Sequence, residues 1–470
     1  MMRFTRSIWF NTLLRETYNS LPFPEHIKHR LKEIYLGRAG TWKISNKDVF
    51  KLDGGLEALP RVAASARQFD PDDPWVLVID LRIPTPDQDS GSVRISAILH
   101  LLRETGFRIT FISDSEEPLP CDQENLELRG IEVLSGFDAA RHHLAAAGGK
   151  YHFSLLSRPE VALRYLPYVR AYALYSYVIY DTVDLHWIRF EREMRISDDP
   201  ALLGRIASFR RTELFNTACA DLTLAISDEE KNCLITEQPD ANVAVLPNIH
   251  EIFPPKTPFA LRKGLLFIGG FWHKPNEDAA IHFANNILPQ ITEKIPNVVF
   301  YIIGSNMPAS VKSLRSHNVE PLGFVADVAP YFESCRVFVA PLRFGAGMKG
   351  KVGQSMSHGL PVVTTQIGAE GMDLQHEQEL LIADNPLDFA DGVIRLYHDE
   401  ILWHRLSARA LAHVDANYSH AATQKRMARI FSGRQGKPNP PRCYEFHDTA
   451  IPTSSGEVSA SSKVTGQRTG

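Results

Sequence analysis

Residues 337–358 read VFVAPLRFGAGMKGKVGQSMSH and carry the clearest sign of the fold class. The first four residues, Val337–Ala340, are a short apolar run typical of a strand buried on both faces of a sheet. A glycine-rich turn follows, and the residues from about Val352 to His358 are expected to form a helix. A strand, a turn and a helix in this order predict the ligand-binding edge of a parallel α/β sheet.

The glycine-rich turn has the chemistry of a diphosphate site. Glycines such as Gly347 let the backbone approach a ligand, and the first N–H groups of the helix point toward anions. Lys349 and Lys351 add positive charge. The structural alternative is a turn with solvated lysines. The stretch also contains Gly-x-Gly-x-x-Gly, but the next strand ends in Thr364–Gln366 rather than in an acidic residue, which argues against a nicotinamide dinucleotide site.

Strands and helices alternate along two separate parts of the chain. Apolar strands are expected at 75–80, 108–112, 154–156, 177–180 and 222–226, and then at 265–268, 298–303, 337–340 and 362–364. Because 470 residues exceed one ordinary core, the sequence predicts an α/β fold with two doubly wound, Rossmann-like domains that face each other across a cleft. The expected boundaries are a basic, helical N-terminal extension at 1–70, a first domain at 71–246, a proline-rich linker at 247–263, a second domain at 264–431 and a disordered tail at 432–470.

Charge and cysteine content exclude several classes of protein. Lys and Arg number 51 against 55 Asp and Glu, so the chain has no overall positive field to attract nucleic acid. The five cysteines are odd in number, far apart and never form Cys-x-x-Cys, which argues against a disulfide framework and a zinc site. With no apolar run near the ~20 residues of a membrane span, we expect a cytoplasmic protein.

Residues 1–45 differ from the rest of the chain, because they carry eight basic residues against three acidic ones. Phe4, Trp9 and Phe10 are interleaved with the basic residues, which predicts an amphipathic helix. Such a helix could lie on anionic lipid and give peripheral contact with the inner face of the membrane. Packing of the helix on its own domain explains the same pattern, and the sequence leaves both interpretations open.

Several short motifs carry a resemblance to a known family. They are Leu266–Gly270 with Pro275 and Asn276, Ile302–Gly304, Ala340–Arg343 leading into the glycine-rich turn, Gly359–Thr365, and Gly368–Gly371. Together these motifs resemble those of the sugar-nucleotide-dependent retaining glycosyltransferases of family 4, which have the two-domain GT-B fold. The resemblance covers about residues 75–430 and includes Pro84–Arg94 and Asp181–His186 in the first domain.

The resemblance implies a role for residues on both sides of the cleft. Lys351 matches the lysine that contacts the donor diphosphate and stabilises the leaving group, and Lys349 stands where the family often has another basic residue. Gly91 matches a first-loop glycine that admits phosphate or sugar. His186 corresponds to a histidine near the transferred sugar, although a histidine packed beside Trp187 is the ordinary alternative.

Further donor contacts are implied with some departures from the family pattern. Gly269, Gly270, Gly347 and Glu370 fall at donor-side positions of the matching motifs, while Lys274 is the basic residue that follows the first glycines, in uncertain register. The family's paired glutamates are replaced here by Ala346 and Gln354. Because an amide oxygen accepts hydrogen bonds less strongly than a carboxylate, Gln354 is expected to weaken the contact with the donor ribose.

A metal site is not expected. Asp87-x-Asp89 has the spacing of the metal-binding pair in the other large glycosyltransferase fold, but Lys351 and a helix terminus already supply positive charge here. We therefore expect Asp89 to cap a helix or contact the acceptor. Neither a metal nor another cofactor is predicted, and the nucleotide diphosphate sugar is a substrate.

The expected function is the transfer of a hexose from a nucleotide diphosphate sugar to a glycan or lipid-linked acceptor in the biosynthesis of surface polysaccharide or glycoconjugates. Two alternatives remain open. Nucleotide-sugar epimerases share this architecture but need acid–base carboxylates near the sugar. A catalytically silent scaffold in a polysaccharide assembly complex is the second alternative, because Ala346 and Gln354 replace two glutamates.

Overall fold

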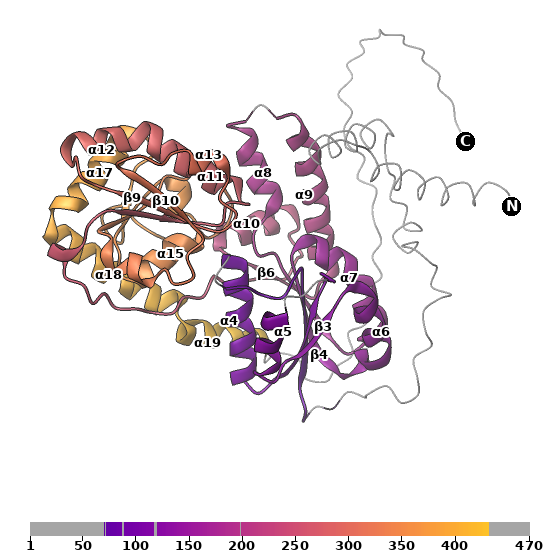
Figure 1. The fold of residues 1–470 in the computed structure, drawn as a ribbon. Coiled ribbons are helices and arrows are strands. Elements are labelled where there is room, and N and C mark those ends of the chain that lie inside the picture. Colours follow the sequence, from indigo (N-terminus) through magenta and orange to yellow (C-terminus); the bar gives the residue numbers. More distant parts are fainter. Residues whose placement is uncertain (1–69, 71, 87–88, 117–119, 198, 432–470) are drawn as a thin grey trace, which may run out of the picture. The chain divides into compact units, whose positions relative to one another are not determined.

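The computed structural model describes residues 70, 72–86, 89–116, 120–197 and 199–431. The expected helix within residues 1–45, the tail at 432–470 and Asp87 lie outside the described residues. All of the described residues belong to one unit of the chain, which contains two parallel sheets with helices on their faces (Figure 1).

The first sheet contains seven parallel strands among the described residues, in the order β3-β2-β1-β4-β5-β6-β7. Alternate residues of the central strand β1 enter different cores: Val76 and Val78 lie in one apolar cluster, and Leu77 and Ile79 lie in another. Burial on both faces explains why the strand is continuously apolar. The strands are β1 (Trp75–Asp80), β2 (Arg108–Ser113), β3 (Glu132–Ser135), β4 (Tyr151–Ser157), β5 (Tyr177–Asp181), β6 (Leu222–Ala225) and β7 (Val243–Val245).

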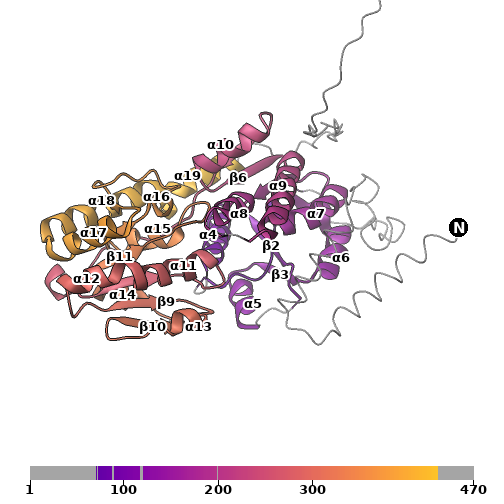
Figure 2. The ribbon, with the colours of Figure 1, turned by 90° about the horizontal axis from the view of Figure 1, so that it is seen from above.

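Helices follow the strands of this sheet and cover both of its faces, as the two views show (Figures 1 and 2). The helices α8 and α9 lie side by side. The helical elements are α4 (Ser90–Glu104), α5 (Pro120–Glu127), α6 (Phe137–Ala147), η2 (Gly148–Lys150), α7 (Pro159–Tyr172), α8 (His186–Met194), α9 (Ala201–Cys219) and α10 (Asp228–Glu237).

The second sheet has six parallel strands among the described residues, in the order β10-β9-β8-β11-β12-β13. The expected α/β fold with two doubly wound sheets is confirmed. The sequence did not predict β3, β7, β10 or β13. The strand β10 contains Pro321, which a sheet tolerates at an edge position such as this one. The strands are β8 (Leu265–Ile268), β9 (Phe300–Ile303), β10 (Val319–Gly323), β11 (Val337–Ala340), β12 (Val362–Thr364) and β13 (Leu381–Ile382).

The helices of the second half include the predicted helix after the glycine-rich turn, which is α15. In the described part of the chain, no helix combines the length and the hydropathy that crossing a membrane requires. The helical elements are η3 (Phe259–Leu261), α11 (Lys274–His282), the π-helical η4 (Phe283–Ile287), α12 (Leu288–Lys294), α13 (Ala309–Lys312), α14 (Ala329–Ser334), α15 (Gly350–Ser357), α16 (Gln366–Ala369), α17 (Pro386–His398), α18 (Glu400–Tyr418) and α19 (His420–Phe431).

The final helix α19 packs on the first sheet, although the sequence placed residues 264–431 in the second domain. Met427 and Phe431 belong to the apolar cluster of the first sheet, and the Phe431 ring lies 4.9 Å from that of Phe153 between centroids. The helix also lies beside α4 (Figure 1). The amphipathic pattern of α19 shows which face is apolar, but not which domain covers that face.

Arg94 on α4 makes a buried polar connection within the first domain. Its side chain is 1% exposed and donates two hydrogen bonds to Asp181 at the end of β5, at 2.8 and 3.2 Å. Its third nitrogen donates to the carbonyls of Leu246 and Pro247 at 2.6 and 2.8 Å. Arg94 therefore joins a helix, a strand end and the start of the segment that leads to the second domain.

We expect Arg94→Ala to lower the free energy of unfolding by about 3–5 kcal/mol, because Asp181 would remain as a buried carboxylate without its partner. Urea denaturation followed by circular dichroism measures the change. The control is Arg103→Ala, an exposed arginine on the same helix, which should change stability by no more than about 0.5 kcal/mol. A loss below 1 kcal/mol in Arg94→Ala would contradict the role given to this ion pair.

Candidate functional site

A cavity of about 500 Å³ lies between residues of the first and second domains. Its lining comes from loops that follow the strands and from the first turns of α4 and α15. The two helix starts are close together, since a side chain at Gly350 would meet Cβ of Ser90 at 3.0 Å. Ligands of parallel α/β sheets bind at this edge, so the cavity is the candidate site.

The two helix starts differ in how they are capped. Asp89 caps α4, because its carboxylate accepts hydrogen bonds from the backbone N–H of Ser92 at 2.9 Å and from the Ser92 hydroxyl at 2.8 Å. The expectation that Asp89 caps a helix is confirmed. The N-cap residue of α15 is Lys349, and its side chain makes no capping hydrogen bond to the helix. The positive end of the α15 dipole is therefore open to an anion in the cavity.

Lys351 lines the cavity one residue inside α15. Its ammonium group donates a hydrogen bond to the Asn276 side chain, and among the described residues no carboxylate lies within ion-pair distance of it. Burial, together with the charge of Lys349, lowers the pKa of Lys351 to about 7. Lys351 is thus a desolvated cation that a phosphate group would stabilise.

Lys349 has a different environment, although the sequence suggested similar roles for the two lysines. Its side chain is buried, and the ammonium group donates to the carbonyls of Ala346 (3.1 Å) and Gly347 within its own turn. Glu370 lies 3.6 Å away. Burial lowers the pKa of Lys349 to about 8, and the Glu370 charge limits the decrease. Lys349 therefore stabilises the conformation of the glycine-rich turn through these hydrogen bonds, and it also lines the cavity.

Arg192 on α8 is a contact that the sequence analysis missed. Its guanidinium binds both carboxylate oxygens of Glu370, at 2.5 and 2.6 Å, and donates to the Gly345 carbonyl at 2.7 Å. Both oxygens of Glu370 are therefore engaged by the first domain, and Glu370 does not line the cavity. An arginine among the mixed charges of a surface helix gives no sequence signal of this role.

Gly347 contacts the first domain and does not line the cavity. Its φ is +63°, and an added Cβ would lie 3.2 Å from Asp184 Cβ and from Ile226 Cγ2. The position therefore disfavours a side chain for two reasons: a positive φ strains other residues, and the neighbouring atoms would have to shift by a few tenths of an ångström. The sequence predicted that this glycine makes room for a ligand, whereas the structure shows that it makes room for the neighbouring domain.

The other glycines and Lys274 are placed as follows. Gly91, Gly269 and Gly270, which the resemblance assigned to the donor side, line the cavity. Lys274 does not line it: its ammonium group is paired with Glu193 of α8 at 3.1 Å, and its side chain is largely exposed. Asn276, two residues after Lys274, does line the cavity, and its side-chain oxygen accepts a hydrogen bond from Lys351.

His186 lines the cavity at the first residue of α8. Its Nδ1 lies 3.1 Å from the Asp184 carbonyl and 3.3 Å from a Glu213 carboxylate oxygen. Burial would lower the pKa of His186, but the charge of Asp184 and the hydrogen bond with Glu213 outweigh it, so the pKa is raised. The ring stacks on Phe209 at 5.1 Å between centroids, rather than on Trp187.

Further lining residues of the cavity come from the glycine-rich turn, from α15 and from the segment after β7. Gln354 and Ala346, which replace the family's two glutamates, both line the cavity. The same lining includes Phe253 and His358, whose rings stack at 4.5 Å between centroids. No motif in the sequence pointed to Phe253 or His358, because they come together only when the segment after β7 packs against the end of α15.

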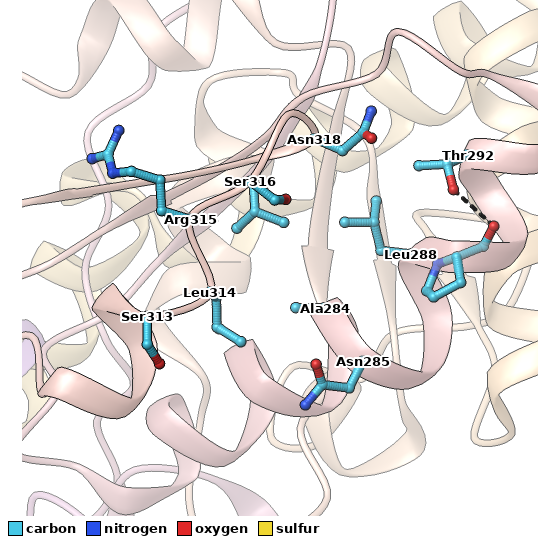
Figure 3. A pocket seen from close by; sticks show the side chains of 11 residues that line it. Ala284, Asn285, Leu288, Thr292, Ser313, Leu314, Arg315, Ser316 and Asn318 are labelled. Carbon is cyan, nitrogen blue, oxygen red and sulfur yellow. Dashed lines mark hydrogen bonds between the residues drawn. The ribbon is translucent and has the colours of Figure 1, made fainter.

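A second cavity, of about 480 Å³, lies in the second domain between the η4–α12 helices and the segment from α13 to β10 (Figure 3). Its charged lining residue, Arg315, is paired with Glu320 and donates to the Pro321 carbonyl. Nothing here resembles the convergence of helix starts and lysines in the first cavity. In the described part of the chain, no group of three or more His, Cys, Asp and Glu side chains is arranged to hold a metal ion.

Comparison with known sequences supports the assignment of the second domain. Residues 262–399 match the model of the family described as glycosyl transferases group 1. A Klebsiella pneumoniae protein, described as an uncharacterized 44.6 kDa protein in the cps region, is 22% identical over 163 residues, which are 33% of this chain and 42% of that protein. The chain matches less than half the length of its curated relatives.

Solved structures share the fold at low sequence identity. Sucrose-phosphate synthase from Thermosynechococcus elongatus aligns with a TM-score of 0.60 at 12% identity, over 76% of this chain and 98% of the synthase. HepE from Anabaena, solved with UDP and glucose, aligns with a TM-score of 0.59 at 13% identity, over 77% of this chain and all of HepE (100%). The second domain is thus similar in sequence to group 1 glycosyl transferases, and the described part of the chain has the GT-B fold of known glycosyltransferases.

Proposed function

We propose that this chain is a retaining glycosyltransferase that moves a hexose from a nucleotide diphosphate sugar to a glycan or lipid-linked acceptor. The observation that carries the proposal is Lys351, a desolvated lysine at the uncapped start of α15, with no carboxylate partner among the described residues. A diphosphate bound there would restore the charge of the lysine and occupy the positive end of the helix dipole.

The proposed chemistry is stabilisation of the leaving group. Negative charge grows on the departing nucleotide diphosphate as the bond to the sugar breaks, and groups already fixed around it lower the barrier most. Lys351 and the first N–H groups of α15 would provide that stabilisation without a metal ion or another cofactor. The retaining stereochemistry rests on the motif resemblance alone, and the anomeric configuration of the product tests it.

His186 would act on the other side of the bound donor. Because Asp184 and Glu213 favour the charged imidazolium, the ring can donate a hydrogen bond to an oxygen of the transferred sugar. Gln354 would face the ribose. The acceptor would enter from the first domain, past Gly91 and Arg158, which also line the cavity.

The proposed donor class and pathway draw support from similar proteins. HepE was solved with UDP-glucose, and the pneumococcal O-GlcNAc transferase GtfA with UDP and GlcNAc. The Klebsiella relative is named for its place in a cps region. The names of HepE and GtfA favour a uridine donor as the first to test. A role in surface polysaccharide is part of the same proposal. Contact of residues 1–45 with the inner membrane surface belongs to the same proposal.

The proposal predicts that Lys351→Ala lowers sugar transfer about 100-fold, because one fixed charge on the leaving group is lost. A thermal-shift screen of UDP-, GDP- and ADP-sugars first identifies the donor, and transfer from that donor is then measured for wild type and variant. Lys312→Ala, an exposed lysine on α13, is the control.

A change of less than threefold in Lys351→Ala, with the fold intact, would remove the lysine from the diphosphate site. The assays contain EDTA, because the proposal gives the charge on the phosphates to Lys351 and not to a metal. Activity that returns only with manganese or magnesium would contradict the metal-free chemistry.

Donor binding should also depend on pH. The pKa of Lys351 is about 7 in the free protein, so at pH 8 most molecules carry a neutral amine, and binding of a diphosphate takes up a proton. At pH 6 the lysine is already mostly charged, so donor binding takes up few protons. Affinity should therefore rise as the pH falls from 8 to 6. Isothermal titration in buffers of different ionisation enthalpy counts the protons, and Lys351→Met should remove most of the uptake.

Gln354 tests whether the donor ribose lies against α15. We expect Gln354→Glu to bind the donor as tightly as wild type or more tightly, because an ionised acceptor makes a stronger hydrogen bond. Gln354→Ala should weaken binding by about 0.5–1.5 kcal/mol, the usual net value of one hydrogen bond. Isothermal titration measures both variants. If both bind the donor like wild type and only their melting temperatures change, Gln354 is a packing residue of α15.

A further inference from the structure

Glu230 is a buried acid that lies beneath the candidate site without lining it. It is the third residue of α10, whose N-cap is Ser227, so the sequence Ser-Asp-Glu-Glu has the pattern of a capping box. Only half of the box is formed: the Ser227 hydroxyl accepts from the Glu230 backbone N–H at 3.3 Å. The Glu230 carboxyl is turned away from the helix start and has another partner.

That partner is the backbone of the loop that carries His186. One Glu230 oxygen, Oε1, accepts a hydrogen bond from the N–H of Leu185 at 3.0 Å, immediately before His186 in the chain. The other oxygen, Oε2, is buried and has no hydrogen-bond partner among the described residues. A carboxyl with one orphan oxygen is unfavourable for stability alone, so this position calls for a reason beyond helix capping.

The same carboxyl also meets the second domain. A Cβ atom at Gly347 would lie 3.1 Å from Glu230 Oε1. Gly347 belongs to the turn that carries Lys349 and leads directly into Lys351. One oxygen atom of Glu230 therefore lies beside both halves of the site: it accepts a hydrogen bond from the His186 loop, and it lies next to the space above Gly347 in the glycine-rich turn.

The charged groups around Glu230 favour its neutral form. Burial raises its pKa to about 8, and the negative charges of Asp184 and Glu213 act in the same direction, while Lys349 opposes them. Arg192 and Cys233 are also within electrostatic range. At pH 7 the group is therefore mainly a carboxylic acid, which an amide of the same shape can replace.

We propose that Glu230 is a positioning residue that holds the His186 loop against the glycine-rich turn, so that the imidazole and Lys351 face one bound sugar diphosphate. The inference rests on the proposed function for the identity of the ligand. It adds that the geometry of the site depends on a side chain that touches neither sugar nor phosphate. A displacement of about 1 Å between reacting groups is enough to cost a large factor in rate.

The variants Glu230→Gln and Glu230→Ala separate this role from ordinary capping. Glutamine keeps the shape of the neutral acid and an oxygen for Leu185, whereas alanine removes both. Glu229→Ala, an exposed acid in the same helical turn, is the matched control. If Glu230→Ala does not fold, Glu230→Asp takes its place, because the shorter side chain draws the oxygen away from Leu185.

Two measurements are made on the full chain at pH 7: amide hydrogen exchange of the peptides that cover residues 183–190 and 342–351, and transfer kinetics with the donor from the screen. We expect Glu230→Ala to speed exchange in both peptides. Its kcat should fall at least tenfold, with the donor KM within threefold of wild type. Glu230→Gln should restore both properties to within threefold, and Glu229→Ala should change neither.

Faster exchange in Glu230→Ala that is confined to residues 183–190 would overturn the proposal, because the turn would then not depend on Glu230. A folded Glu230→Gln variant that is as impaired as Glu230→Ala would overturn it too. The exchange result does not require activity. If wild type transfers no sugar but Glu230→Ala speeds exchange in both peptides, only the proposed function fails. If wild type is active but Glu230→Ala speeds exchange in residues 183–190 alone, only the role of Glu230 fails.

Discussion

The contact between Gly347 and the loop of Asp184 is the constraint on which the site depends. The glycine-rich turn of the second domain reaches the first domain only because position 347 has no side chain, since Asp184 and Ile226 lie 3.2 Å from where Cβ would be. Arg192 of the first domain also holds the glycine-rich turn close, because it binds Glu370 and the Gly345 carbonyl of the second domain. The cavity between the domains has its shape because these contacts set the distance between two helix starts.

The charged groups around the cavity fall into two sets: those paired with an opposite charge of the protein, and those that face the cavity without such a partner among the described residues. The first set is neutralised within the protein: Arg94 by Asp181, Arg192 by Glu370, and Lys274 by Glu193. Lys349 belongs to neither set alone: it lines the cavity, but its ammonium group donates hydrogen bonds within its own turn. Lys351 is left with an amide oxygen as its partner. A cavity that presents a desolvated cation at an uncapped helix start selects for an anion, and this selectivity needs no further charged residue.

The histidine side of the cavity is held by acids rather than by cations. Glu213 accepts hydrogen bonds from the backbone N–H groups of His186 and Trp187, and Glu230 accepts from that of Leu185. Three consecutive N–H groups at the start of α8 are thus satisfied by two buried carboxyls. Orphan N–H groups at a helix start need such acceptors, and here the acceptors come from α9 and α10, so three helices determine where the imidazole lies.

Local sequence patterns were enough to predict the fold class and to indicate an anion site in the second domain. Continuous apolar runs such as Trp75–Asp80 and Val337–Ala340 predict buried parallel strands because periodicity is a local property of the chain. The glycine-rich turn likewise indicates an anion site, since Lys351 and the first turn of α15 are neighbours along the chain. The packing of the folded chain shows that Lys349 forms its hydrogen bonds within its own turn and that Glu370 binds Arg192. It also shows that Gly347 makes room for the first domain and that α19 returns to the first sheet. Arg192 and Phe253 gave no signal, and the capping-box pattern at Glu230 indicated only the start of a helix. Each of the three acquires its role from a residue far away in the chain, and the distances between domains are set by packing that no local pattern records.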